Sequence, residues 1–246
     1  MPIEPFLAGQ ALHRLGATKE AKMYVRKAQD RGHADHGWLK SHHSFSFANY
    51  YDPAHMGFSH LRVINDDWVA PSMGFGRHGH RDMEIISYVI RGALAHKDSQ
   101  GNQATIPAGD IQIMSAGTGI EHSEFNASDN EDVNFLQIWV LPKQQGIQPR
   151  YEQKKIVQDG VLTPIVTPQG SDTAVAINAD VSMSQLKLSR GQKHGFSGSG
   201  YLHLVAGQAV TDGAQFKAGD GLGLLAGESI DIEADQDLTA LWFDLP

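Results

Sequence analysis

The sequence contains no cysteine among its 246 residues, which excludes disulfides, thiolate metal ligands, iron–sulfur clusters and cysteine nucleophiles. Basic residues are also few: 20 Lys and Arg stand against 28 Asp and Glu, a formal net charge of −8, whereas nucleic-acid binding needs a basic face. No apolar run approaches the roughly 18 residues of a membrane span, and residues 1–4 lack the basic-then-apolar start of a signal peptide. We therefore expect a soluble, cytoplasmic protein with no membrane partner and no direct nucleic-acid partner.

Histidine, by contrast, is abundant and unevenly distributed. Eleven of the 13 histidines fall at or before His122, and only His194 and His203 follow it. Histidine is the commonest metal ligand and the usual acid–base group near neutral pH. Any single histidine is by default a surface or hydrogen-bonded core residue, but the clustering places the expected chemistry in the first half of the chain.

The predicted fold class is all-β. From about residue 60 onward, short runs rich in Val, Ile, Phe, Tyr and Trp are bounded by Gly, Pro, Asn and Asp, and helical periodicity is absent after residue 35. The expected strands include residues 83–90, 111–116, 133–141, 185–188, 201–205 and 238–245.

An internal repeat indicates two copies of one β unit. Strand-like runs end at Gly92 and at Gly207, an offset of 115. Ala-Gly-Asp turns then end at Asp110 and Asp220, an offset of 110, and an Ala-Gly pair follows each of them at the same offset. Two antiparallel copies in a chain of this length predict two small β-barrels or jelly rolls in tandem.

The expected domain boundary lies in the polar stretch between Lys143 and Gly170. We assign residues 1–22 to an N-terminal extension of unknown role, 23–145 to a first barrel that binds metal, and 146–246 to a second barrel that lacks metal ligands.

The candidate metal site consists of two short pairs. His78 and His80 are two residues apart, as are His122 and Glu124, and residues i and i+2 of a strand point to the same face. Two such pairs on neighbouring strands can converge on one point. Three neutral imidazoles and a carboxylate suit a divalent first-row metal. Glu84 shares the strand parity of His78 and His80.

The repeat provides an internal control. The offset of 115 places His78, His80 and Glu84 on Lys193, Gly195 and Ser199, whereas the offset of 110 places His122 and Glu124 on Ile232 and Ala234. The second copy therefore keeps the turns and is expected to lose all four ligands, which indicates a functional role for them in the first copy.

Two further groups receive structural rather than chemical roles. His42 and His43 have no partner at ligand spacing and point to opposite faces of a strand. Aromatic residues before the metal motifs are expected to pack in the core or between the domains; these are Trp38, Phe45, Phe47, Tyr50 and Tyr51.

These motifs resemble those of the pirin family, whose members are built from two cupin barrels. The two matching motifs are Gly76-Arg77-His78-Gly79-His80-Arg81-Asp82-Met83-Glu84 and Gly117-Thr118-Gly119-Ile120-Glu121-His122-Ser123-Glu124. The resemblance runs from Met23 to the C-terminus and is densest over residues 31–142, so residues 1–22 fall outside it.

The resemblance implies a metal, iron first, bound by residues at the positions of His78, His80, His122 and Glu124. It also implies flavonol cleavage, because some bacterial pirins act on quercetin, whereas a eukaryotic member is a nuclear transcription cofactor. Histidine and carboxylate ligands also bind Mn, Co, Ni, Cu or Zn. We therefore expect Fe(II), with these other metals as alternatives.

Our first hypothesis is a metal-dependent dioxygenase that cleaves a flavonol such as quercetin with dioxygen, with Glu124 as the general base. The alternative is a non-enzymatic metal or redox sensor that regulates a protein partner. A metal-dependent isomerase or hydrolase is a third hypothesis, since one fold hosts many reactions.

Overall fold

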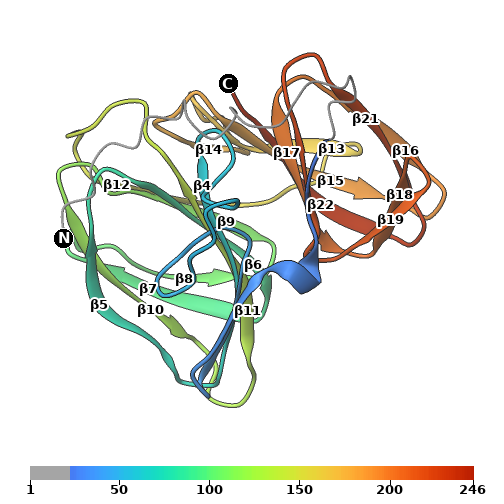
Figure 1. Cartoon of the computed structure of the whole chain (residues 1–246). Helices are drawn as coiled ribbons and strands as arrows, with labels where there is room; N and C mark the ends of the chain where they lie inside the picture. Colours follow the sequence, from blue (N-terminus) through green and yellow to red (C-terminus); the bar gives the residue numbers. More distant parts are fainter. Residues whose placement is uncertain (1–22) are drawn as a thin grey trace.

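The computed structural model describes residues 23–246, which form two β-barrels side by side (Figure 1). The predicted all-β architecture of two barrels is confirmed. The expected extension over residues 1–22 lies outside the described residues. Within the described part, the single helical element is the 3₁₀ turn η1, Ala28–Asp30, and no helix is long and apolar enough to cross a membrane.

The first barrel combines a large and a small antiparallel sheet. The large sheet has the strand order β12-β9-β6-β11-β4-β3-β2, and the small sheet has the order β5-β10-β7-β8. The strands are β2 Gly32–Asp35, β3 Leu39–His43, β4 Leu61–Val69, β5 Gly74–His80, β6 Glu84–Arg91, β7 Ala93–Asp98, β8 Gln103–Pro107, β9 Asp110–Ser115, β10 Ile120–Asn126, β11 Val133–Val140 and β12 Arg150–Lys155.

The second barrel repeats this plan. Its sheets have the orders β1-β20-β17-β22-β15-β13-β14 and β16-β21-β18-β19. The strands are β1 Tyr24–Arg26, β13 Leu162–Thr167, β14 Val175–Ala176, β15 Ser182–Leu188, β16 Lys193–Ser197, β17 Gly200–Ala206, β18 Gln208–Thr211, β19 Ala214–Lys217, β20 Gly221–Leu224, β21 Ser229–Ala234 and β22 Leu238–Asp244.

The turns that revealed the repeat hold equivalent places in both barrels. Gly92 follows β6 with a φ of 76°, and Gly207 follows β17 with a φ of 86°. A Cβ at Gly207 would lie 2.1 Å from the carbonyl oxygen of Asp237, so both the left-handed backbone and the close approach require glycine there.

In each barrel, one edge strand of the large sheet lies outside the repeated sequence. β12 follows the first repeat and pairs with β9, whereas β1 precedes the first barrel and pairs with β20 of the second (the blue strand beside the orange-red barrel in Figure 1). The boundary at residue 145 remains a prediction. The pairing of β12 favours a transition between the barrels after Lys155.

Aspartates of the two Ala-Gly-Asp turns help to fix these edges. Asp110 accepts a hydrogen bond from Gln153 Nε2 on β12 at 2.8 Å. Asp220 accepts one from the main-chain N–H of Ala28, the first residue of η1, at 2.6 Å. One turn aspartate therefore connects each barrel to its edge segment.

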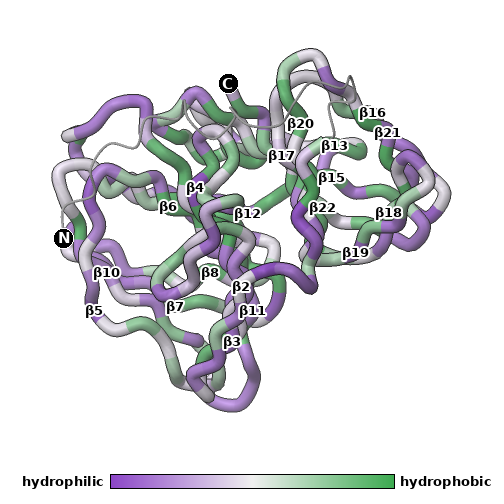
Figure 2. Tube along the Cα trace, in the orientation of Figure 1, coloured by the Kyte–Doolittle hydropathy of each residue, from purple (hydrophilic) through white to green (hydrophobic). Residues whose placement is uncertain are grey.

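The barrels pack through the outer faces of their large sheets. Ile64, Ile86 and Ile138 of the first barrel belong to the same buried cluster as Tyr201 and Leu241 of the second. Figure 2 shows hydrophobic stretches along the strands that meet there. Because neighbouring residues of a strand point to opposite faces, the alternate residues of β4, β6 and β11 face the interior of the first barrel.

Candidate metal centre

Strand β10 brings the predicted ligands together because it pairs on both sides. Against β5, His122 lies opposite His78 and Ile120 lies opposite His80. Against β7, Glu124 lies opposite His96. The β5–β10 register shifts between His122 and Glu124, an irregularity that re-aims side chains next to a site.

Three of the four predicted ligands form one cluster. The ligand atoms of His78, His80 and His122 lie within 4.8 Å of one another, and the Nε2 atoms of His80 and His122 are 3.0 Å apart. Two nitrogen ligands at right angles around a metal, each bonded at about 2.1 Å, lie about 3 Å apart. The histidine geometry therefore fits a divalent first-row metal.

Burial keeps His80 and His122 neutral, the form that binds a metal. Burial, and then the neighbouring imidazoles, lower the pKa of His122 to about 2, and burial followed by His78 lowers the pKa of His80 to about 4. Nδ1 of His78 lies 2.8 Å from the carbonyl oxygen of Gly76, which accepts only, so the neutral form of this ring has its hydrogen on Nδ1 and its lone pair on Nε2. All three rings are thus suited to donate a lone pair to a cation.

Glu124 lies in an overlapping cluster rather than in the three-histidine cluster. Its ligand atom is within 4.8 Å of those of His96 and His122. Ser87 Oγ donates to Oε1 at 3.1 Å, and Gln137 Nε2 donates to Oε2 at 2.7 Å. Burial raises the pKa of Glu124 to about 7, against the effect of these two hydrogen bonds. His122 is the residue common to both clusters.

His96 also belongs to the site, although it was not predicted from the sequence. Its side chain is buried on β7, 5.3 Å from the His122 ring between centroids, and Nε2 lies 3.4 Å from Asp98 Oδ2. His96 and Asp98 have the same two-residue spacing as the pairs that were recognised, and this was the available signal. Glu84, which shares the strand parity of His78, belongs to neither cluster and accepts hydrogen bonds from Ser115 Oγ and the Asn178 N–H.

A cavity of about 640 Å³ opens onto this site. His78, His80 and Glu124 form part of its wall, and aromatic side chains form another part: Trp38, Phe47, Tyr50, Phe75 and Trp139. The volume is in the range of sites for small organic ligands.

The expectation that the early aromatic residues pack in the core or between the domains, away from a substrate site, is wrong for three of them. Trp38, Phe47 and Tyr50 line the cavity, because β3 extends the large sheet beside β4 and these residues lie in the loops on either side of β3. Phe45 is a core residue, as expected, whereas Tyr51 is 73% exposed. His43 also lines the cavity.

One correspondence between the barrels differs from the prediction. His194 lies opposite Ile232, as His78 lies opposite His122, and Phe196 has the place of His80. The offset on this strand is therefore 116 rather than 115, because the connection to the next strand is one residue shorter in the second barrel. One imidazole is retained there, so three of the four ligand positions are lost instead of all four.

Comparison with known proteins gives matches along almost the whole described chain. The family model described as Pirin matches residues 24–140, and that of the quercetinase C-terminal cupin domain matches 164–245. A quercetin 2,3-dioxygenase of Escherichia coli K12 is 45% identical over 230 residues, covering 91% of this chain and 99% of that protein. A putative quercetin 2,3-dioxygenase of Pasteurella multocida is 43% identical over 229 residues, covering 90% and 98%.

Solved structures agree with these matches. A bacterial pirin from Escherichia coli in complex with nickel(II) superposes with a TM-score of 0.87 at 44% identity, covering 92% of this chain and 99% of that one. A quercetin 2,3-dioxygenase from Acinetobacter baumannii, with a TM-score of 0.71 and 21% identity over 89% of this chain and 84% of that one, shares the fold.

Proposed function

Because this chain belongs to the pirin family of two-barrel cupins, we propose that it is a metal-dependent dioxygenase that cleaves a flavonol such as quercetin. The observation that carries the proposal is the geometry of the first barrel. Clustered histidines and a buried carboxyl group border a 640 Å³ cavity with aromatic walls. A site of this kind accepts a planar aromatic molecule and a metal together.

We assign His78, His80, His122 and Glu124 as the residues that would hold one divalent metal, with Fe(II) as the first choice. The bacterial pirin from Escherichia coli was solved in complex with nickel(II), which supports a divalent ion as the metal. The same donor set also accommodates manganese, cobalt, copper and zinc, so cellular supply contributes to the choice. When bound, the metal would stabilise the oxyanion of a substrate hydroxyl and bring it beside dioxygen.

The protein residues prepare the substrate for this step. The Glu124 carboxylate takes the proton of the reacting hydroxyl as the substrate arrives. Each carboxylate oxygen offers two lone pairs, so the hydrogen bonds from Ser87 and Gln137 hold the group in place and leave room for a proton. Trp38, Phe75 and the other aromatic walls contact the flat faces of the substrate and exclude water.

Oxygen uptake tests this proposal. Protein purified without added metal is assayed for bound metal and then for dissolved-oxygen consumption with quercetin, beside His78→Ala and Glu124→Ala. We expect uptake in the wild type, its loss in both variants, and retention in the control His194→Ala. Metal-loaded wild-type protein that consumes no oxygen with any flavonol would contradict the dioxygenase proposal.

The same assay separates the alternative function. A non-enzymatic metal or redox sensor acting through a protein partner would bind metal and consume no oxygen. Its partner would then bind in only one oxidation state of the metal. A cytoplasmic location remains a prediction under either function.

A further inference from the structure

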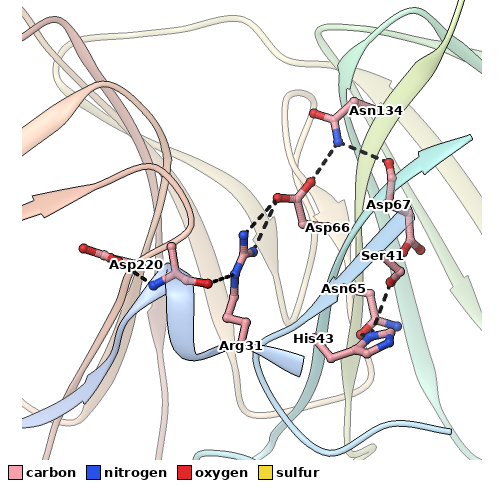
Figure 3. Close-up of polar contacts among 9 residues, drawn as sticks. Arg31, Ser41, His43, Asn65, Asp66, Asp67, Asn134 and Asp220 are labelled. Atoms are coloured by element: carbon pink, nitrogen blue, oxygen red, sulfur yellow. Dashed lines mark hydrogen bonds and ion pairs between the residues drawn. The ribbon is translucent and has the colours of Figure 1, made fainter. Parts of the chain in front are cut away.

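The cavity has a second polar region, which the proposed reaction does not use. Ser41 and His43 on β3 and Asn65 and Asp67 on β4 all line it, and each is at most 5% exposed. In the sheet, His43 lies opposite Asn65 and Ser41 lies opposite Asp67, so the four side chains form one compact group (Figure 3). Buried polar groups of this kind need hydrogen-bond partners.

His43 has a fixed tautomer that leaves one nitrogen available. Its Nδ1 lies 2.7 Å from Asn65 Oδ1, and because an amide oxygen only accepts, Nδ1 carries the hydrogen. Ser41 Oγ lies 3.3 Å from the same nitrogen. Burial lowers the pKa of His43, which keeps the ring neutral. Nε2 is therefore a hydrogen-bond acceptor, and it has no partner within residues 23–246.

Asp67 offers a second unused acceptor. Its Oδ1 is buried and has no hydrogen-bond partner among the described residues. On the other face of β4, Asp66 accepts hydrogen bonds from the Arg31 guanidinium and from Asn134 Nδ2, which also donates to the main-chain oxygen of Asp67 (Figure 3). The backbone is thus held so that Asp67 faces the cavity. A buried carboxyl oxygen without a partner costs stability, unless a ligand completes the bond.

The two polar regions of the cavity belong to one continuous wall. Asn65 lies opposite Gln137 on the next strand, and Gln137 donates to Glu124 at the metal centre. Rings of Phe47 and Tyr50 flank His43, with centroids 5.5 and 6.2 Å from its own. An aromatic ligand that places one hydroxyl at Glu124 can therefore place a second polar group along the same wall.

We propose that Ser41, His43, Asn65 and Asp67 form a second subsite that binds another hydroxyl group of the substrate, with His43 Nε2 and Asp67 Oδ1 as acceptors. This inference rests on the proposed function and narrows its substrate class to aromatic compounds hydroxylated at two ends. In this proposal His43 binds the second hydroxyl and takes no part in the proton transfer at Glu124. A buried site built to bind a hydroxyl discriminates against an analogue that lacks it.

The test compares two flavonols by binding rather than by turnover. Quercetin and 3-hydroxyflavone share the reacting hydroxyl, and 3-hydroxyflavone lacks all the others. Their Kd values are measured with the metal-loaded protein by quenching of tryptophan fluorescence in the absence of oxygen. We expect the wild type to bind quercetin about tenfold more tightly.

Variants locate the source of this preference. His43→Phe and Asp67→Leu should each reduce the Kd ratio several-fold and leave the Kd of 3-hydroxyflavone within about twofold of the wild type. His42→Phe is the matched control, since His42 packs on the His33 ring and does not line the cavity. Thermal unfolding verifies that each variant is folded.

Three results would overturn the subsite: a wild type without preference, a ratio unchanged in both variants, or equal weakening of both flavonols. The first needs no variant, so a misfolded variant does not remove the test. Binding preference without oxygen uptake would contradict the dioxygenase proposal and leave the subsite standing. If neither flavonol binds, both proposals fail.

Discussion

The interior of the first barrel and that of the second differ sharply, although their strands have the same order. Where the first has His80, His122 and Glu124, the second has Phe196, Ile232 and Ala234, all part of one apolar cluster. The residues that donate hydrogen bonds to Glu124 are also replaced by apolar ones in the second barrel. The positions of Ser87 and Gln137 correspond to Leu202 and Trp242.

The second barrel shows what this fold requires without a metal site. Phe196 stacks on Trp242 with ring centroids 4.3 Å apart, so apolar packing replaces the hydrogen-bonded carboxyl group. Burying apolar groups is favourable, whereas burying a carboxyl group or an imidazole costs free energy unless it is paired. The polar interior of the first barrel is therefore a cost to stability that function explains.

The largest expected effect is on catalysis, from Glu124→Ala, which introduces the residue of the second barrel. Loss of the base should lower kcat for quercetin about 10²- to 10⁴-fold. Oxygen uptake at saturating substrate measures it. A kcat within threefold of the wild type would show that Glu124 is not the base.

A smaller effect is expected from Gln137→Leu, which removes one hydrogen bond to Glu124 and leaves the metal-ligand positions intact. Partners of ligating side chains typically contribute about 10- to 100-fold to metal affinity or activity. Metal titration and oxygen uptake together measure this loss. Unchanged values in both would mean that Ser87 alone is sufficient to orient the carboxyl group.

The edge strands give a comparison based on stability. Asp220 is 1% exposed and accepts hydrogen bonds from two main-chain N–H groups, Ala28 and Lys217, whereas Asp110 is only half-buried. Asp220→Ala should lower the free energy of unfolding by about 1–3 kcal/mol, and Asp110→Ala by less. Urea denaturation measures both. Equal losses would contradict the stronger anchoring of the second barrel's edge.

The pH dependence of stability gives an expected effect that is small over any single pH unit. Burial raises the pKa of Asp67 to about 7, Ser41 opposes this, and the charges of Asp66 and Glu124 add to it. The folded state holds this proton at a pH where the unfolded state has released it. The free energy of unfolding therefore falls as the pH rises from about 4 to about 7, by about 1.4 kcal/mol per pH unit.

Asp67→Asn should remove this contribution. The free energy of unfolding of each protein is measured at pH 5 and at pH 6. Between these values the wild type should lose about 1 kcal/mol more than Asp67→Asn. Parallel pH profiles would show that Asp67 ionises normally in the folded protein.

The sequence was sufficient to predict the features that depend on local spacing. The glycine turns at Gly92 and Gly207 revealed the repeat, and the two-residue spacing of His78 and His80 placed both on one strand face. These signals work because turn geometry and strand parity are local properties of the chain.

Features that depend on contacts between distant segments were not predictable in this way. The pairing of β1 with the second barrel and the arrival of Trp38 and His43 at the cavity follow from tertiary packing. The position of His194 was missed because a loop one residue shorter changes the parity of a whole strand. A single-residue error of this kind reverses every inward and outward assignment on that strand.

Metal content is the most direct test of the claim that only the first barrel binds the metal. Wild-type protein, His122→Ile and His194→Ala are purified without added metal, and bound metal per chain is measured by elemental analysis. The account predicts one divalent ion per chain in the wild type and in His194→Ala, and none in His122→Ile, which introduces the counterpart from the second barrel. Undiminished metal in His122→Ile, or its loss in His194→Ala, would contradict the account.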